Sequence, residues 1–181
     1  MMEPARPAAS SISRTSKALQ ALDNSLVLAR HILSLLKPDQ PQDEALLARQ
    51  LATYGIAVYA TWTVEAIRAL VSADLSQQAL LQARALWELR VNLLFIEKDW
   101  QARAPRFIYH DVVTRRRFIE EAGKNPAGPW GAAFREHPEK VQEIEQAYQD
   151  LARHFPELVE ETRGWSGKSI KDMADAVDLG E

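Results

Sequence analysis

Long stretches of this chain place an apolar residue at every third or fourth position without an intervening proline. The clearest stretch runs from residue 13 to residue 37, where six apolar residues follow that spacing: Leu19, Leu22, Leu26, Ala29, Leu33 and Leu36. Because an α-helix turns once every 3.6 residues, the spacing gathers them on one face. The composition agrees, since 27 Ala and 21 Leu stand against 10 Val, 9 Ile and 6 Thr. The sequence therefore predicts an all-α fold.

Proline and glycine residues divide the chain into a predicted bundle of five or six helices. Five of them span roughly 13–37, 43–72, 76–98, 103–122 and 138–155. Ser169 and Asp172 form a capping-box pattern that opens a short sixth helix. The residues from Gly123 to Pro129 form the plainest loop. We expect residues 1–12 to be disordered and residues 13–181 to form a single all-helical domain.

The third predicted helix differs from the others because apolar residues surround almost its whole circumference. Helices of that kind are normally buried at the centre of a fold. We therefore expect a central, mostly buried third helix. Trp62 and Trp87 lie in apolar helical segments and are expected in the core, whereas three tryptophans flank loops and are expected to cover the ends of the core: Trp100, Trp130 and Trp165.

A line of polar residues runs along the otherwise apolar third predicted helix, because Arg84, Glu88 and Asn92 recur at every fourth position. Burial of a charged group costs several kcal/mol per ion unless a partner satisfies it. The next helix offers partners on one of its faces, namely Arg106, Tyr109 and His110. We expect a semi-buried polar network that either fixes the helix register or binds a ligand, formed by Arg84, Glu88, Asn92, Arg106 and Tyr109.

The same residues carry a resemblance to a bacterial family. The run from Arg84 to Ile96, the segment Arg106-Phe-Ile-Tyr109 and the segment Trp165-Ser-Gly-Lys-Ser-Ile resemble the uncharacterised family called domain of unknown function 5677. The resemblance covers about residues 76–177. It implies an all-helical fold without an assigned activity. Members of the family continue beyond the Trp-Ser segment into a further helix with Tyr, Ser and His, which the sequence ending at Glu181 does not include.

A metal-independent ribonuclease is the enzyme class that fits the residue pattern best. The chain resembles small helical toxin and defence nucleases, which carry an Arg, four to six further residues and then a His. Arg103 and His110 are separated by six residues, and Arg106 adds a second cation one turn before the histidine. Arginine and histidine together orient a phosphate and transfer protons. Arg103, Arg106 and His110 are therefore the catalytic candidates of this alternative.

The sequence contains no residue pattern that is typical of a metal site or a cofactor site. The chain has no cysteine, no Glu-x-x-His pair of the kind that builds a di-metal site in a bundle, and no Gly-x-Ser-x-Gly elbow. Asp150 and His154 stand one helical turn apart, a spacing more typical of a surface pair than of an ion site. We expect neither a metal nor a cofactor.

Charge and hydropathy indicate where the protein is located and which partners it binds. The N-terminal residues lack the apolar core of a signal peptide. The charge-free stretch 50–64 is too short and too polar to span a bilayer. The net charge of −3 argues against general nucleic-acid coating. We expect a cytoplasmic interaction or binding module without a membrane span, which forms a homo-oligomer or binds a protein partner; RNA is the partner under the ribonuclease alternative.

Overall fold

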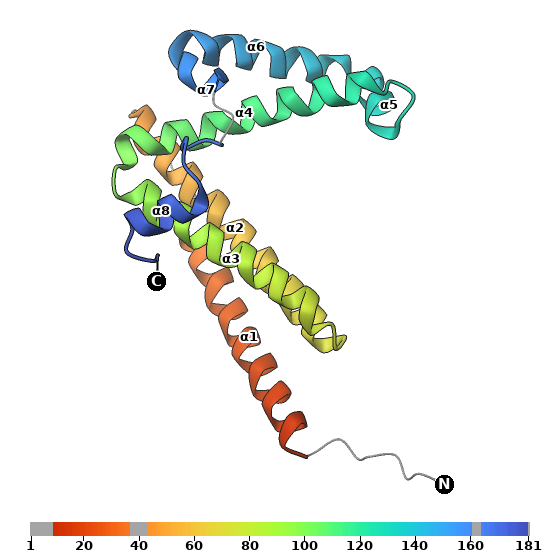
Figure 1. Cartoon of the computed structure of the whole chain (residues 1–181), viewed down its shortest axis with the longest axis vertical. Coiled ribbons are helices and arrows are strands. Elements are labelled where there is room, and N and C mark those ends of the chain that lie inside the picture. Colours follow the sequence, from red (N-terminus) through yellow and green to blue (C-terminus); the bar gives the residue numbers. More distant parts are fainter. Residues whose placement is uncertain (1–8, 37–42, 161–163, 181) are drawn as a thin grey trace. The chain divides into compact units, whose positions relative to one another are not determined.

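The structure is a computed structural model that describes residues 9–36, 43–160 and 164–180, with side chains from Ser16 onward (Figure 1). Within these residues there is no strand, and none of the helices is long and apolar enough to cross a membrane. The described helices are eight, not five or six: α1 Ala9–Leu35, α2 Glu44–Ser72, α3 Ser76–Glu97, α4 Trp100–Lys124, α5 Pro129–Glu136, α6 Pro138–His154, α7 Pro156–Glu160 and α8 Ile170–Ala176. The prediction of an all-α fold is confirmed.

Two short helices, α5 and α7, were not predicted from the sequence. Both begin at a proline, Pro129 and Pro156. Proline suits the first position of a helix because its missing N–H would have no partner there. At the other end of the chain, α1 already begins at Ala9, within the segment expected to be disordered. Residues 1–8 lie outside the described residues.

The described residues fall into two compact units. Unit 1 takes its residues from 1–39 and 53–93, and unit 2 takes its residues from 40–52 and 94–181. The division runs through α2 and α3, so each of these helices contributes residues to both units. A single domain over residues 13–181 stays a prediction.

Unit 1 contains the α1 stripe that the sequence predicts. Leu26 is buried at its centre, and the other five residues of the stripe are partly buried. Two ion pairs tie α1 to α2 along one edge: Arg30 Nη2 lies 2.6 Å from Glu65 Oε1, and Arg68 pairs with Asp23. The stripe is therefore a packing face within unit 1.

In unit 2, α4, α6 and α7 pack around a small core. Val113 of α4, Leu151 of α6 and Leu158 of α7 are each at most 3% exposed. Figure 1 shows α4 and α6 running side by side, and they share the largest helix contact of this unit. Arg116 of α4 strengthens the contact, because its guanidinium lies 4.1 Å from the ring centre of Tyr148 on α6.

The C-terminal part of unit 2 packs against aromatic residues of α3 and α4. Trp165 is 8% exposed and meets Phe95 and Phe107 edge-on, with ring centres 5.8 and 5.2 Å apart. The predicted capping box of α8 is confirmed, because the Ser169 hydroxyl accepts a hydrogen bond from the Asp172 amide while the Asp172 carboxylate accepts one from the Ser169 amide. The Ser169 hydroxyl also donates a hydrogen bond of 2.8 Å to the Asp172 carboxylate, and this bond, together with the one from the Ser169 amide, holds the pKa of Asp172 below its usual value.

Candidate functional site

The polar line of α3 is more exposed than the sequence suggested. Arg84 Nε donates a hydrogen bond of 3.0 Å to Glu88 Oε1, and their side chains are 74% and 37% exposed. Asn92 Nδ2 donates to the backbone carbonyl of Glu88 at 2.8 Å. These bonds lie within one helix, and a pair of this kind contributes only about 0.3–0.5 kcal/mol. Arg84 is thus exposed within unit 1, Glu88 and Asn92 are partly buried, and the semi-buried polar network stays a prediction.

The two expected partners of that line have other contacts, within unit 2. Arg106 Nη1 lies 3.6 Å from Glu157 Oε1, and the Tyr109 hydroxyl donates a hydrogen bond to the Glu44 carboxylate. Thus the five predicted network residues divide, with three on the unit 1 part of α3 and two on α4 in unit 2. A functional role for the five together stays a prediction.

The catalytic candidates of the ribonuclease alternative all lie on α4. Arg103 Nη1 donates to the Phe95 carbonyl at 2.6 Å, and its guanidinium lies 3.9 Å from the Phe95 ring centre. His110 Nδ1 lies 3.4 Å from Thr114 Oγ1. Arg103 therefore contacts the last turn of α3 through Phe95. Arg106 is paired with Glu157. Cleavage of RNA stays a prediction.

The third helix is not mostly buried in its unit 1 part. Leu80 and Leu81 are 70% and 69% exposed, and Trp87 is 38% exposed. On α2, Trp62 is 59% exposed, although it was expected in the core. The apolar circumference of α3 is real, but the residues of unit 1 cover only part of it.

Helix α1 carries a second apolar stripe beside its packing face. All six of its residues are exposed and follow a three- and four-residue spacing: Ala18, Ala21, Ser25, Leu28, Ile32 and Leu35. On α3, four exposed residues of unit 1 have the same spacing: Leu80, Ala83, Trp87 and Arg90. Such spacing is typical of a helix that packs against another helix along a seam. We call these two sets the exposed stripes.

An apolar groove lies between the exposed stripes. Its volume is about 530 Å³, and its walls include Ile32 of α1 and both Ala83 and Trp87 of α3. Residues of α2, among them Ile56 and Ala60, line it as well. Its only charged lining residue is Arg90. The groove therefore borders both exposed stripes, because Ile32, Ala83, Trp87 and Arg90 belong to its lining. The stripes are apolar except for Ser25 and Arg90.

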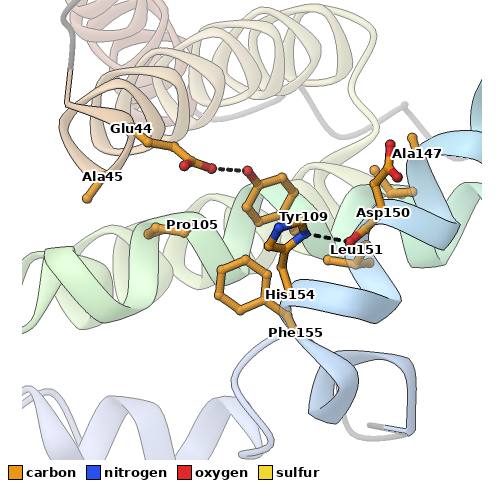
Figure 2. Close-up of a pocket in the computed structure, with 10 residues that line it drawn as sticks. Glu44, Ala45, Pro105, Tyr109, Ala147, Asp150, Leu151, His154 and Phe155 are labelled. Atoms are coloured by element: carbon orange, nitrogen blue, oxygen red, sulfur yellow. Dashed lines mark hydrogen bonds between the residues drawn. The ribbon is translucent and has the colours of Figure 1, made fainter.

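A second cavity, with a different chemistry, lies within unit 2. It measures about 700 Å³ and opens between the start of α2, the middle of α4 and the end of α6 (Figure 2). Apolar and aromatic side chains make most of its wall, and four residues bring polar groups to it: Glu44, Tyr109, Asp150 and His154. Mostly apolar cavities of this size with a few convergent polar groups are typical of small-molecule sites. We call it the unit 2 cavity.

One wall of the unit 2 cavity is fixed by the hydrogen bond from Tyr109 to Glu44, drawn in Figure 2. The Tyr109 ring also packs on Phe155, with ring centres 5.1 Å apart. The bond to the Glu44 carboxylate, together with partial burial, raises the pKa of Tyr109 to about 12, because ionised tyrosine could no longer donate the proton and would repel the carboxylate.

A titration of phenolate absorbance tests this contact. A phenol with a pKa of about 10 in the unfolded chain and about 12 in the folded one stabilises the fold fully below pH 10. That contribution is lost as the pH rises from 10 to 12. Tyr109→Phe is expected to remove a phenol transition near pH 12, and Glu44→Gln is expected to move the Tyr109 transition from about 12 toward 10. If Tyr109→Phe instead removed a phenol transition near pH 10, that result would contradict the hydrogen bond from Tyr109 to Glu44.

Asp150 and His154, which lie one helical turn apart on α6, form another wall of the unit 2 cavity. His154 Nδ1 lies 2.8 Å from the backbone carbonyl oxygen of Asp150. A carbonyl only accepts hydrogen bonds, so Nδ1 carries the proton, and in the neutral ring Nε2 remains an acceptor. Asp150 is also held by Arg153, whose Nη1 lies 3.3 Å from Asp150 Oδ1 in an exposed pair.

Sequence reasoning missed this cavity, although it noted the Asp150 and His154 spacing. Neither Glu44 nor Phe155 belongs to a motif that the sequence shows. Among the described residues no three side chains are placed to hold a metal ion. The combination of Glu44, Tyr109 and His154 arises only from folding.

Comparison with known proteins gives one match. A family model described as a family of unknown function (DUF5677) matches residues 50–181. No curated protein and no solved structure matches the chain.

Proposed function

We propose, from the premise that this chain belongs to the family of unknown function DUF5677, that it is a helical interaction module whose unit 1 binds a second copy of itself. The observation that carries the proposal is the groove of unit 1 with an exposed stripe along each side. In a twofold dimer the same surface meets itself, so the α1 stripe of one copy lies along the α3 stripe of the other.

The amount of exposed apolar surface supports this proposal. Single exposed apolar residues are ordinary in monomeric proteins, but a continuous patch marks an interaction site. Five large apolar side chains of the exposed stripes are at least 38% exposed: Leu28, Ile32, Leu35, Leu80 and Trp87. At such fractions each exposes on the order of 100 Å². Together they supply on the order of 500 Å², more than half of the ~800 Å² per partner that a stable interface buries.

The charge of unit 1 supports a second copy as the occupant of the groove. Residues 16–36 and 53–93 carry five basic and four acidic side chains. Three of the basic groups are already paired with acidic groups of unit 1. Two copies therefore meet without strong like-charge repulsion, whereas a strongly charged partner would find no complementary surface.

Self-association also accounts for the apolar circumference of α3. Leu80 and Trp87 are exposed in one copy, but the partner would cover them in the dimer. The third helix would then be central to a bundle of helices from two chains, which is the position that its sequence favours.

Sedimentation velocity of the full chain tests the proposal. Wild-type protein is expected to sediment at twice the chain mass of 20.4 kDa. Leu28→Glu places a charge on the exposed stripe of α1, where the twofold repeats it, and is expected to weaken the dimer roughly a hundredfold or more.

Val27→Glu is the matched control, because Val27 is the preceding residue of α1, is 69% exposed and lies off the stripe. It is expected to leave the dimer intact, and far-ultraviolet circular dichroism of both variants is expected to match the wild type. A wild-type protein that stays monomeric, or two variants that dissociate alike, would overturn the proposal.

A further inference from the structure

We propose that the unit 2 cavity binds an organic ammonium ion with an apolar body. The cavity belongs entirely to unit 2, so this inference is independent of the self-association of unit 1. It rests on the hydrogen-bonding groups, the charge and the aromatic wall of the cavity.

The polar groups of the cavity are almost all hydrogen-bond acceptors. Glu44 and Asp150 contribute carboxylates, and His154, whose Nδ1 faces the Asp150 carbonyl, offers Nε2 as an acceptor when its ring carries one proton. The one hydroxyl proton, that of Tyr109, is donated to Glu44. A ligand that fits this arrangement must supply the donors, as an ammonium group does with its N–H bonds.

The charge of the lining selects a cation. Two of the ten lining residues are acidic, and none is a lysine or an arginine. Arg153 reaches Asp150 from outside the lining, but their side chains are 70% and 52% exposed, and pairs of that kind are weak. An anionic ligand would meet two carboxylates without a compensating cation.

The aromatic and aliphatic walls favour an organic ion over a metal ion. Tyr109 and Phe155 form a pair of rings, and ring faces attract ammonium groups. Val112, Leu151 and Pro105 complete an apolar wall against which a hydrocarbon body packs. A metal ion would need several converging ligands, and the described part of the chain offers no such group of three.

Figure 2 shows how these groups surround the space. Glu44 and Tyr109 stand on one side, joined by their hydrogen bond, while Asp150 and His154 come from α6, and the Phe155 ring lies beside His154. The volume of about 700 Å³ falls within the range of small-molecule sites. The carboxylates thus lie at the edge of an apolar space large enough for a ligand of drug-like size.

Isothermal titration calorimetry with three matched probes tests the inference on the full chain. The probes are 4-phenylbutylammonium, 4-phenylbutanol and 4-phenylbutanoate, which share one body and differ in charge. The ammonium ion is expected to bind at least about tenfold more tightly than the alcohol, and the carboxylate is expected not to bind. Absence of ammonium binding at millimolar concentration, or equal binding of the carboxylate, would overturn the proposal.

Variants then locate the binding site. Glu44→Gln keeps an oxygen that accepts the Tyr109 hydrogen bond but removes the charge, so it is expected to weaken ammonium binding about tenfold and to leave alcohol binding unchanged. Glu143→Gln is the matched control, because Glu143 is an exposed residue of α6 outside the cavity lining. Ammonium binding that neither Glu44→Gln nor Asp150→Asn weakens would place the ligand elsewhere and overturn the proposal.

Discussion

Replacement of Trp165 by alanine is expected to lower the free energy of unfolding by about 3–5 kcal/mol, the usual cost of removing a large buried aromatic side chain. Trp165 is only 8% exposed and lies edge-on to Phe95 and Phe107. Its removal would leave a cavity between the end of α3 and the start of α4. Urea denaturation followed by circular dichroism measures the loss.

Trp130→Ala provides the matched control within unit 2. Trp130 is 60% exposed and contacts Phe118 at a ring-centre distance of 5.3 Å. The same truncation there is expected to cost about 1 kcal/mol, most of it from the lost aromatic contact. If Trp165→Ala does not fold, Trp165→Phe, which retains part of the contact, is expected to be folded and less stable than the wild type. Equal costs for Trp165→Ala and Trp130→Ala would show that Trp165 is not a core residue.

Gly131→Ala is expected to destabilise the protein by about 1–3 kcal/mol, although alanine is the better helix former. Gly131 is buried in α5, where an added Cβ would lie 2.6 Å from the Asn125 carbonyl oxygen and 2.7 Å from Pro126 Cα. Both are backbone atoms, so the clash cannot be relieved by a side-chain rotation. The turn before α5 must move instead.

Gly123→Ala is expected to have the opposite effect. Gly123 lies in the last turn of α4, and nothing is within 4 Å of a Cβ built there. Alanine therefore gains the ordinary helical preference of up to about 1 kcal/mol. Thermal unfolding of the two variants is expected to shift in opposite directions. A rise in melting temperature for both would contradict the close backbone approach at Gly131.

The long helices follow from periodicity, because their apolar spacing is a local property of the sequence. The stripe from Leu19 to Leu36 and the capping box at Ser169 appear in the structure as predicted. The short helices α5 and α7 escaped prediction, since eight and five residues are too few to display a period. Pro129 and Pro156 were the only local signals of where they begin.

The candidate sites were harder to predict, for two physical reasons. The apolar circumference of α3 says that Leu80 and Trp87 favour burial, but it does not say whether their own chain or a second copy covers them. The unit 2 cavity joins Glu44, Tyr109 and His154, which are far apart in the sequence and belong to no short motif. Only the packing of α4 against α6 and the start of α2 brings them together.

For the proposed dimer, the nearly balanced charges of unit 1 have a consequence for how quickly two copies would meet. Without long-range electrostatic steering, encounters proceed at a basal rate of about 10⁵–10⁶ M⁻¹ s⁻¹. At a concentration of ~100 nM, a newly made chain would then need on the order of ten to a hundred seconds to find its partner. Changes in ionic strength would alter that delay little, so the abundance of the chain would govern the speed of its assembly.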